Sequence, residues 1–346
     1  MKKIFITLLT IAISFSFIKL EAQKHTELLG AGATFPYPLY SRMFEDYYKQ
    51  TNIKVNYQGI GSGGGIRQLI SKTVDFGGTD AIVTPDKIAE ASAKIVHVPI
   101  CLGAVVITYN LPNSPKLKLN SDIISDIYLG KIVKWNDEAI QKLNPSVKLP
   151  ALNIAVVRRS DGSGTTSIFT NYLSKISSEW KDKVGEGTSI NWPVGLGAKG
   201  NPGVAGMVQQ VPGAIGYVEL IYAMSNNMPY ADIKNKSGNF VEPSLTSVSL
   251  SADIDLPDDT LVSLTDTDAK FGYPISGFTW IILYQEQNYS NRTNVQAYET
   301  AQLLNWMINE GQKHAEPLHY APLSKEAQKK AQNIIKNLTF KGKKLL

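Results

Sequence analysis

The chain has 346 residues, of which 43% are hydrophobic and 19% charged, so it is long enough for two ordinary domains and too evenly mixed for a disordered protein. Its 27 glycines and 17 prolines are near average usage, and no heptad or internal repeat is present, which excludes fibrous and solenoid architectures. A single cysteine, Cys101, excludes an intramolecular disulfide. The four histidines are scattered, which excludes a Cys/His zinc site.

Residues 1–22 have the pattern of a secretory signal peptide. A basic start at Lys2 and Lys3 precedes an apolar run over 4–18, which is shorter than a bilayer-spanning helix, and Ala22 supplies a small residue at the end. We expect cleavage after Ala22, with an uncleaved membrane anchor as the alternative. Because no cysteine lies near the cut, we expect no lipid anchor.

The net charge favours neither nucleic acid nor a membrane surface as the partner. The whole chain carries +5, and residues 1–22 contribute three lysines and one glutamate, a net +2, so cleavage leaves +5 minus +2, or +3. Both kinds of partner favour clustered basic stretches. The one tight basic cluster, Lys341 with Lys343 and Lys344, stands at the C-terminus and is interpreted as a solvated tail.

The first part of the chain alternates helices with short strands. Helical spacing of apolar residues and period-two alternation locate these elements. In chain order they are a helix over 36–50, a strand over 54–58, a helix after the glycine loop 59–65, and short strands over 74–79, 95–100 and 103–109. The last three runs are rich in β-branched residues, which is typical of buried parallel strands.

The same alternation continues to the C-terminus. Asn201-Pro202-Gly203 opens a helix, with Asn201 as the expected capping residue. The remaining elements are helices near 121–129 and 137–143, a strand over 154–157, a loop over 158–164, helices over 165–175 and 201–211, strands over 214–218 and 277–284, and helices near 295–310 and 324–337. Residues 226–268 stay unassigned. This order predicts an α/β architecture with mainly parallel sheets.

Three loops share one construction, in which a strand ends in small residues and a helix follows at a Ser or Thr. They are GAGATFP, GIGSGGG and RRSDGSGTT. Helix N-termini present unpaired N–H groups and the positive end of the helix dipole, so each loop is a candidate anion site. The hydroxyls of Thr34, Ser62, Ser163 and Thr165 add neutral donors. For any one loop the alternative is an ordinary helix cap or turn, and the recurrence favours a shared small anion.

Other phosphate and hydrolase motifs fit less well. Gly59-x-Gly61-x-x-Gly64 formally matches the dinucleotide fingerprint, with Asp80 at the distance expected for a ribose contact. That motif leaves the other two loops without a role. Gly164 is followed by a threonine rather than by the lysine of a Walker loop. A nucleophile elbow needs a glycine two residues before its serine and another two residues after it, but Ile60 stands two residues before Ser62 and Asp161 two residues before Ser163.

Charged residues near these loops have alternative roles. Arg158 and Arg159 are neighbours on an extended segment, so we expect only one of them to face the ligand and the other to be a surface charge. Asp161 either holds the inward arginine through a bidentate pair or caps the following helix. Asp80 would repel a bare anion, but an anion that carries a proton can donate that proton's hydrogen bond to Asp80.

Six segments together closely resemble the periplasmic phosphate-binding protein (PstS) family of Pst phosphate ABC transporters. They are GAGATFPYPLY, VNYQGIGSGGGIRQLI, VDFGGTDA, IYLGKIVKWND, NIAVVRRSDGSGTT and PGAIGYVE. The resemblance covers about 29–222, with GYPISGFTWIIL later in the chain, and is weak over 226–268. One loop has Ser62-Gly63 where some members have two serines.

The resemblance implies a two-lobed α/β fold of the type II periplasmic-binding-protein class, with phosphate in the cleft between the lobes. Two crossover strands are expected near 102–105 and 274–278. Lobe I would then comprise 23–104 and 275–346, and lobe II 105–274. The family's ligand contacts fall on Ala33, Thr34, Phe35, Ser62, Asp80, Arg159, Ser163, Gly164 and Thr165, and Asp161 matches the residue that braces the arginine.

The implied function is high-affinity binding of inorganic phosphate in the periplasm and its delivery to membrane permease subunits powered by an ATPase. We expect a monomer without catalytic residues, metal or cofactor. An exported phosphate-ester hydrolase is the first alternative and a secreted dinucleotide-dependent oxidoreductase the second. A hydrolase would need a nucleophile with a base or a metal, and no motif supplies one.

Overall fold

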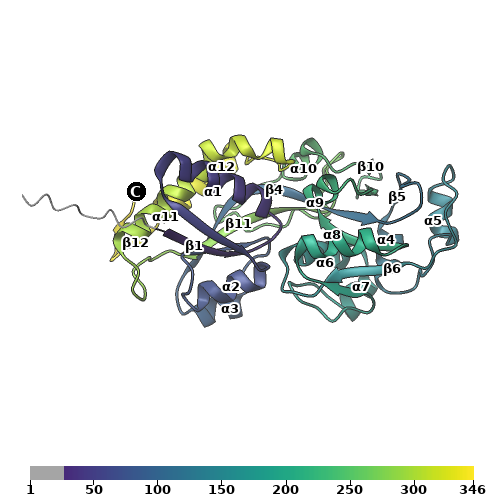
Figure 1. Ribbon diagram of the computed structural model, residues 1–346, viewed down its shortest axis with the longest axis horizontal. Coiled ribbons are helices and arrows are strands. Elements are labelled where there is room, and N and C mark those ends of the chain that lie inside the picture. The colour runs from purple at the N-terminus through teal and green to yellow at the C-terminus, as the bar shows by residue number, and fades with distance from the viewer. Residues whose placement is uncertain (1–26) are drawn as a thin grey trace, which may run out of the picture.

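An eight-stranded mixed sheet runs through the molecule in the order β2-β1-β3-β11-β4-β8-β6-β7. The computed structural model describes residues 27–346, so the expected signal peptide lies outside the described residues. Figure 1 shows two bodies side by side along the long axis, with β4 and β11 passing between them. The strands of this sheet are β1 Glu27–Gly32, β2 Lys54–Gly59, β3 Phe76–Thr79, β4 Ile95–Tyr109, β6 Ala155–Arg159, β7 Leu196–Ala198, β8 Ala214–Glu219 and β11 Ser276–Tyr284.

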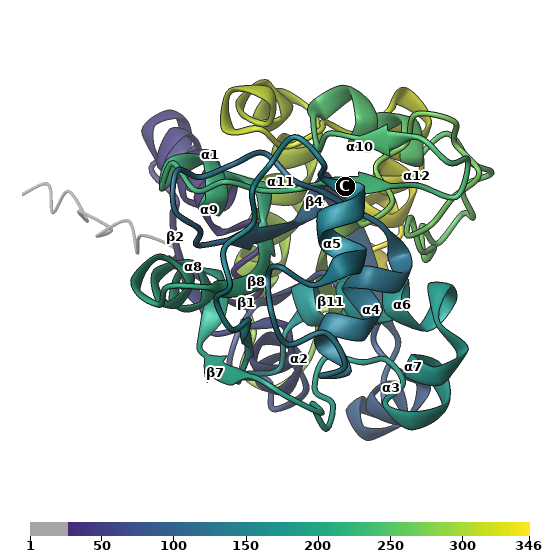
Figure 2. The ribbon, with the colours of Figure 1, turned by 90° about the vertical axis from the view of Figure 1, so that its right-hand side faces the viewer.

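Helices lie on both faces of the sheet in the body that contains the first strands. Figure 1 shows α1, α11 and α12 above the strands and α2 and α3 below them, and Figure 2 shows the opposite end of the molecule, with α4 and α5 facing the viewer. The helices are α1 Tyr37–Thr51, α2 Ser62–Ile70, α3 Pro85–Ala91, α4 Ser121–Tyr128, α5 Glu138–Leu143, α6 Gly164–Ile176, α7 Ser178–Lys183, α8 Gly200–Gln210, α9 Leu220–Ser225, α10 Leu245–Ser251, α11 Asn294–Ile308 and α12 Lys325–Lys336.

The shorter elements include those in the stretch that the sequence left unassigned. Within 226–268 the structure has β9, β10 and α10, and β9 and β10 form a small sheet with β5. The C-terminus ends in a two-stranded hairpin. These elements are β5 Lys118–Leu119, β9 Asp232–Lys234, β10 Phe240–Val241, β12 Thr339–Phe340, β13 Lys343–Lys344, and the 3₁₀ helices η1 Glu310–His314 and η2 Glu316–Leu318.

One continuous strand, β4, replaces the two strands expected over 95–100 and 103–109. Its register against β11 shifts so that Cys101 pairs with Thr279 and Pro99 with Trp280, which leaves Ile100 as an extra residue in a bulge. Proline lacks an N–H donor and is tolerated in a strand at such a bulge. The strand therefore continues through Pro99 instead of stopping there.

β4 changes partners where the two bodies meet. Ile95 to Ala104 pair with β11, and Val105 to Tyr109 pair with β8. The change falls within the crossover predicted near 102–105. Both pairings are antiparallel, which corrects the prediction that these runs are parallel strands. The outer pairs β1–β2, β1–β3, β6–β7 and β6–β8 are parallel as predicted.

Two local predictions near the candidate loops were wrong. β6 extends to Arg159, two residues further than expected, because Arg158 and Arg159 pair with β7. Helix α8 begins at Gly200 after Lys199, and no side chain caps it. The Asn201 side chain instead forms tertiary hydrogen bonds, described below.

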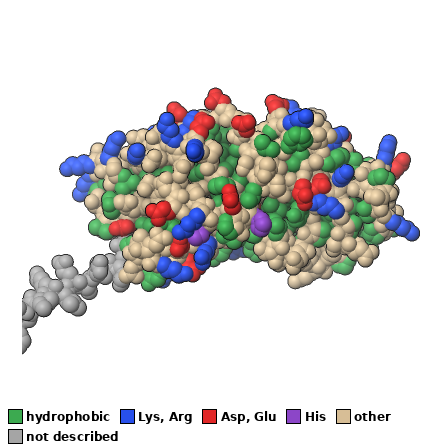
Figure 3. All heavy atoms as spheres, turned by 90° about the horizontal axis from the view of Figure 1, so that it is seen from above, with side chains coloured by type: hydrophobic (Ala, Val, Ile, Leu, Met, Phe, Trp, Pro, Cys, Tyr) green, Lys and Arg blue, Asp and Glu red, His purple; other side chains and the backbone are tan. Residues whose placement is uncertain are grey.

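Acidic and basic side chains are interspersed on the face shown in Figure 3. This mixture agrees with the mild net charge of the sequence. Among residues 27–346, every helix is too short or too polar to cross a membrane.

Candidate functional site

The first turns of α2 and α6 meet across the boundary between the two bodies, and the loop before α1 joins them. The N–H of Gly164 donates to Oγ of Ser62 at 3.0 Å, and the N–H of Gly63 donates to the carbonyl of Gly162 at 2.9 Å. Nδ2 of Asn201, on α8, donates both to the Thr34 hydroxyl in the loop before α1 and to the Thr165 hydroxyl in the first turn of α6, each at 3.1 Å. The structure therefore brings together the three loops that the sequence singled out.

The loop before α1 is fixed by three tyrosine hydroxyls. Tyr57 donates to the carbonyl of Ala33 at 3.0 Å, Tyr222 to that of Thr34 at 2.6 Å, and Tyr320 to that of Phe35 at 2.6 Å. In a trans peptide the N–H points away from the carbonyl, so the first two bonds direct the N–H groups of Thr34 and Phe35 away from these tyrosines. Within the described residues neither N–H has a hydrogen-bond partner.

Ala33, which the resemblance implied as a ligand contact, has both of its backbone polar groups paired within the protein. Its N–H donates to the carbonyl of Gly78 at 2.9 Å, and its own carbonyl accepts from Tyr57. Both of its backbone polar groups are therefore engaged inside the protein. These bonds hold Ala33 in the loop, whereas the N–H groups of the next two residues have no hydrogen-bond partner among the described residues.

The α6 loop presents hydroxyls from a capped helix start. Ser163 is the N-cap of α6, and its Oγ accepts from the N–H of Thr166 at 3.0 Å. Its own N–H donates to the carbonyl of Thr188 at 2.8 Å. Ser163 and Thr165 are both fully buried. Gly164 lies so close to Asp80 that an added Cβ would stand 2.5 Å from Oδ2, which explains the glycine at this position.

Arg159 is the inward arginine of the pair. Its side chain is buried and forms a bidentate ion pair with Asp161, with Nε–Oδ1 at 2.8 Å and Nη2–Oδ2 at 2.5 Å. Asp161 thus braces the arginine, while Ser163 caps the helix. The arginine holds the pKa of Asp161 below its usual range, although burial acts in the opposite direction. Arg158, expected to be a surface charge, is half-buried, and its Nη1 donates to the carbonyl of Arg159.

Asp80 is buried beside the same cluster. Oδ1 accepts from the hydroxyl of Thr279 at 2.7 Å, and Oδ2 lies 3.5 Å from Oγ of Ser62. Burial raises the pKa of Asp80 to about 7, and the hydrogen bond from Thr279 and the charge of Arg159 limit the increase. Asp80 caps no helix, because α3 starts at Pro85 after Thr84. It is the acceptor in a cluster that otherwise consists mainly of donors.

Several residues of the cluster escaped the sequence analysis. Asn201, Tyr57, Tyr222, Thr279 and Tyr320 have polar groups that contact the predicted residues. None of them belongs to a glycine loop. From the sequence alone, a tyrosine or threonine in an apolar strand or helix is interpreted as an ordinary core residue. Asn201 had one recognisable feature in the sequence, its position at an expected helix start. That position fits a helix cap equally well, so it did not predict a role in the site.

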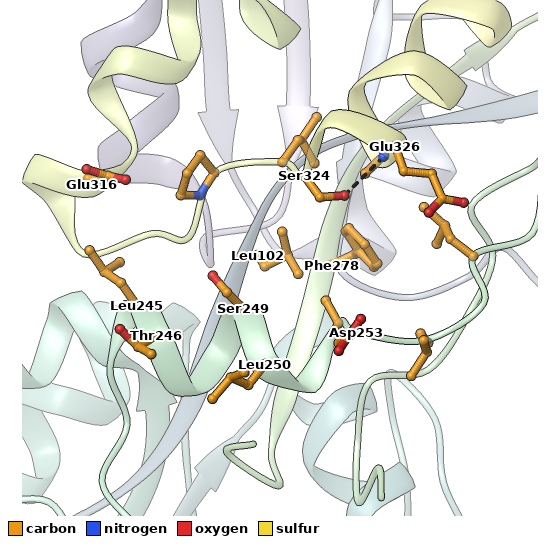
Figure 4. A pocket seen from close by; sticks show the side chains of 16 residues that line it. Leu102, Leu245, Thr246, Ser249, Leu250, Asp253, Phe278, Glu316, Ser324 and Glu326 are labelled. Carbon is orange, nitrogen blue, oxygen red and sulfur yellow. Dashed lines mark hydrogen bonds between the residues drawn. The ribbon is translucent and has the colours of Figure 1, made fainter. Parts of the chain in front are cut away.

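Two hollows lie near the boundary between the bodies. Asp80 lines one of about 260 Å³, together with residues of α6 and β11. The other, of about 690 Å³, lies between α10 and the start of α12, with Leu102 and Phe278 between them (Figure 4). None of the ten site residues predicted from the sequence lines this second hollow. The residues predicted from the sequence therefore lie apart from this second hollow.

The arrangement suits a small anion that carries a proton. Hydroxyls, free N–H groups and one guanidinium supply donors, and Asp80 supplies an acceptor. Within residues 27–346, no group of three or more His, Cys, Asp or Glu side chains is placed to hold a metal ion. The cluster can recognise a ligand both by donating hydrogen bonds to it and by accepting one from it.

Comparison with known proteins places the chain in a family. Residues 19–310 match the model of a PBP superfamily domain. The phosphate-binding protein PstS of Xylella fastidiosa is 44% identical over 308 residues, which are 88% of this chain and 83% of that protein. PstS of Pasteurella multocida is 42% identical over 93% of both chains, and PstS of Methanocaldococcus jannaschii is 39% identical over 84% of this chain and 80% of its own.

Solved structures share the fold at lower identity. A high-affinity periplasmic phosphate-binding protein (PfluDING) bound with phosphate has a TM-score of 0.72 at 22% identity, covering 89% of this chain and 93% of its own. A phosphate-binding protein from Stenotrophomonas maltophilia has a TM-score of 0.66 at 18% identity, with the same coverage. At these identities the likeness shows the fold alone. The sequence relatives go further, and the chain belongs to the PstS family of phosphate-binding proteins within the PBP superfamily.

Proposed function

We propose that this protein binds inorganic phosphate with high affinity in the periplasm and delivers it to the permease of an ABC transporter for import. The observation that carries the proposal is the meeting of three donor-rich loops around one buried acceptor, Asp80. The relatives named above are phosphate-binding proteins, which is a binding role rather than an enzymatic one.

Phosphate at neutral pH matches this mixture of donors and one acceptor. Its oxygens without hydrogen would accept from the N–H groups of Thr34 and Phe35, from the surrounding hydroxyls and from Arg159. Its remaining proton would be donated to Asp80. The ligand contacts in this proposal are Thr34, Phe35, Ser62, Asp80, Arg159, Ser163, Gly164 and Thr165, with Ala33 and Asp161 in supporting positions.

The proposal includes a closing motion of two lobes. We assign 27–104 and 275–346 to lobe I and 105–274 to lobe II, joined by β4 and β11. Hydrogen bonds from Gly164 to Ser62, from Asn201 to Thr34 and from Tyr222 to Thr34 all cross this boundary. A closed arrangement with such contacts encloses the ligand, and opening would release it to the permease.

The same proposal includes the export of the protein, its location in the periplasm and its partners in the transporter. A signal peptide over 1–22 would direct export, and the mature protein would be a periplasmic monomer without a lipid anchor. Its partners would be the membrane permease subunits and, through them, the ATPase of the transporter. Reconstitution with those subunits would test this part separately from ligand binding.

Isothermal titration of the mature protein with inorganic phosphate tests the central claim. We expect one phosphate per chain and no heat with sulfate at pH 8. Arg159→Gln should abolish or greatly weaken binding, whereas Arg158→Gln, a matched change at the neighbouring residue, should retain it. Absence of phosphate binding by the folded wild-type protein would refute the proposal. Steady release of phosphate from an aryl phosphate ester would favour the hydrolase alternative instead.

A further inference from the structure

We propose that Asn201 is a positioning residue for anion selectivity, because it forces the hydroxyls of Thr34 and Thr165 to act as hydrogen-bond donors toward the ligand. This inference rests on the proposed phosphate function and gives a role at the site to a residue that the sequence pattern predicted as a helix cap and that the resemblance did not include. Asn201 is fully buried between the two threonines.

The orientation of the Asn201 amide follows from its neighbours. Oδ1 accepts from the backbone N–H of Glu219 at 3.0 Å, and a backbone N–H can only donate. The opposite end of the amide must therefore be Nδ2. Its two hydrogens are directed to Oγ1 of Thr34 and Oγ1 of Thr165, each at 3.1 Å. One amide thus contacts two of the three loops.

Each threonine hydroxyl accepts two hydrogen bonds from inside the protein. Oγ1 of Thr34 accepts two hydrogen bonds from Asn201, one from Nδ2 at 3.1 Å and one from the Asn201 backbone N–H at 3.2 Å. Thr165 Oγ1 accepts from the same Nδ2 at 3.1 Å and from Nη1 of Arg159 at 3.3 Å. A hydroxyl has two acceptor lone pairs and one hydrogen. With both lone pairs engaged, each hydroxyl has only its hydrogen left for a ligand.

The hydroxyl of Ser62 also accepts two hydrogen bonds from the protein, although neither comes from Asn201. Its Oγ accepts from the N–H groups of Gly164 and Asp80, at 3.0 and 3.3 Å. The Ser62 hydroxyl itself donates to Oδ2 of Asp80 at 3.5 Å. All three hydroxyls therefore act as donors, and Asp80 is the acceptor. Burial raises the pKa of the neighbouring Glu219 carboxyl well above its ordinary range.

The pairing also links ligand binding to the relation between the two bodies. Thr34 precedes α1, whereas Asn201 and Thr165 belong to α8 and α6 on the other side of the boundary. If the bodies separate, Thr34 loses both Asn201 donors, and its hydroxyl is again free to accept from water. The donor set is therefore complete only when the three residues are together.

Titration of Asn201 variants with inorganic phosphate tests the inference. Asn201→Ala removes both amide donors and should weaken phosphate binding about tenfold or more, because both threonine hydroxyls lose a bond that fixes their orientation. Asn201→Asp keeps the shape but places acceptor oxygens and a negative charge against the hydroxyls. At pH 8 it should weaken binding on the order of 100-fold or more. Gln209→Ala, in the exposed last turn of α8, is the matched control and should bind as the wild type does.

A double-mutant cycle separates positioning from a merely structural role. Thr34→Val and Thr165→Val remove the hydroxyls with little change in shape. In that double-valine background Asn201→Ala should change phosphate affinity by less than about threefold, because the groups through which Asn201 acts are gone. A drop as large as in the wild-type background would mean that Asn201 only supports α8, and the inference would be wrong. Thermal melting without phosphate checks that every variant is folded.

The outcomes also separate this inference from the function on which it rests. If the wild type binds phosphate and Asn201→Ala binds it equally well, the positioning role is overturned and the proposed function stands. If the folded wild type binds no phosphate, both fail.

Discussion

The hydroxyl of Thr279 donates a hydrogen bond to Oδ1 of Asp80 at 2.7 Å, although 199 residues separate them in the chain. Thr279 lies on β11, beside the bulge where β11 pairs with β4. The bond occupies one carboxylate oxygen and leaves Oδ2 nearer to Ser62 and Gly164. The crossover strand β11 therefore fixes which oxygen of the Asp80 carboxyl faces the cluster.

Replacing Asp80 by Asn should reduce the preference for phosphate over sulfate. At pH 8 phosphate retains a proton that the ionised carboxylate accepts, whereas sulfate presents only bare oxygens to it. A site that demands a hydrogen-bonding partner can discriminate by roughly four to five powers of ten. Competition titration with both anions measures the ratio. Asp126→Asn, at an exposed ion pair with Lys131, is the control. An unchanged ratio in Asp80→Asn would refute the role of the carboxyl.

Sulfate binding by the wild type should strengthen as the pH falls from 8 to 5.5. The pKa of Asp80 is raised to about 7 by burial, so the carboxyl is ionised at the upper pH and neutral at the lower one. A neutral carboxyl has an O–H that can donate to sulfate. Asp80→Asn should lack this pH step. Titration with sulfate at the two pH values decides the matter, and sulfate affinity that does not change in the wild type would contradict the prediction.

The same pKa predicts how the stability of the ligand-free protein depends on pH. The pKa of Asp80 in the folded protein, about 7, lies above the ordinary aspartate pKa of 3.8, so the folded protein keeps the proton that the unfolded chain loses between these pH values. This contribution is fully present below pH 3.8 and is lost as the pH rises to about 7, by up to about 1.4 kcal/mol per pH unit. Urea unfolding at pH 5 and pH 8 should show a smaller difference between wild type and Asp80→Asn at pH 5.

Tyr222→Phe should weaken phosphate binding about three- to tenfold. Its hydroxyl donates to the carbonyl of Thr34 across the boundary, and a typical hydrogen bond contributes roughly 0.5–1.5 kcal/mol. Tyr128→Phe is the matched control, because the buried Tyr128 hydroxyl has no hydrogen-bond partner among the described residues. Titration of both variants measures the effect. Equal affinities would show that the Tyr222 hydroxyl does not hold the loop.

Removing Asp75 should destabilise the fold without changing the ligand site. Asp75 forms a buried ion pair with Arg292 and accepts from the N–H of Leu29 at 2.7 Å. Asp75→Ala leaves the arginine buried without its partner, which costs about 3–5 kcal/mol of unfolding free energy. Glu45→Gln, at the exposed pair with Arg42 and Lys49, should leave stability unchanged. Urea unfolding compares the two variants, and equal midpoints would contradict the prediction.

The mature protein should begin near Gln23. The pattern over 1–22 predicts export and cleavage after Ala22. N-terminal sequencing of the protein from the producing cells checks this prediction. An intact Met1 in a membrane fraction would favour the uncleaved anchor.

The sequence by itself predicted most of the longer helices and strands and the three loops of the candidate site. Glycines at strand ends, Ser or Thr at helix starts and apolar periodicity act over a few residues, so they are visible locally. The expectation that only one of the two neighbouring arginines points inward is also local, because side chains alternate in direction along an extended segment. Residue spacing left open which arginine points inward and whether Asp161 braces it or caps a helix, and only the resemblance implied Arg159 braced by Asp161. In the structure Arg159 lies at the end of β6, which extends against β7, and pairs with Asp161.

Only the tertiary structure decided which side chains complete the cluster. Asn201 lies 167 residues from Thr34 and Tyr222 lies 188 residues from it, and each bond requires the two bodies to meet. The continuity of β4 was equally hidden, because a bulge at Ile100 accommodates Pro99 only when β11 lies beside it. A polar side chain in an apolar element has no local signature of its partner. Its role is set by the packing that removes it from water and leaves one partner within reach.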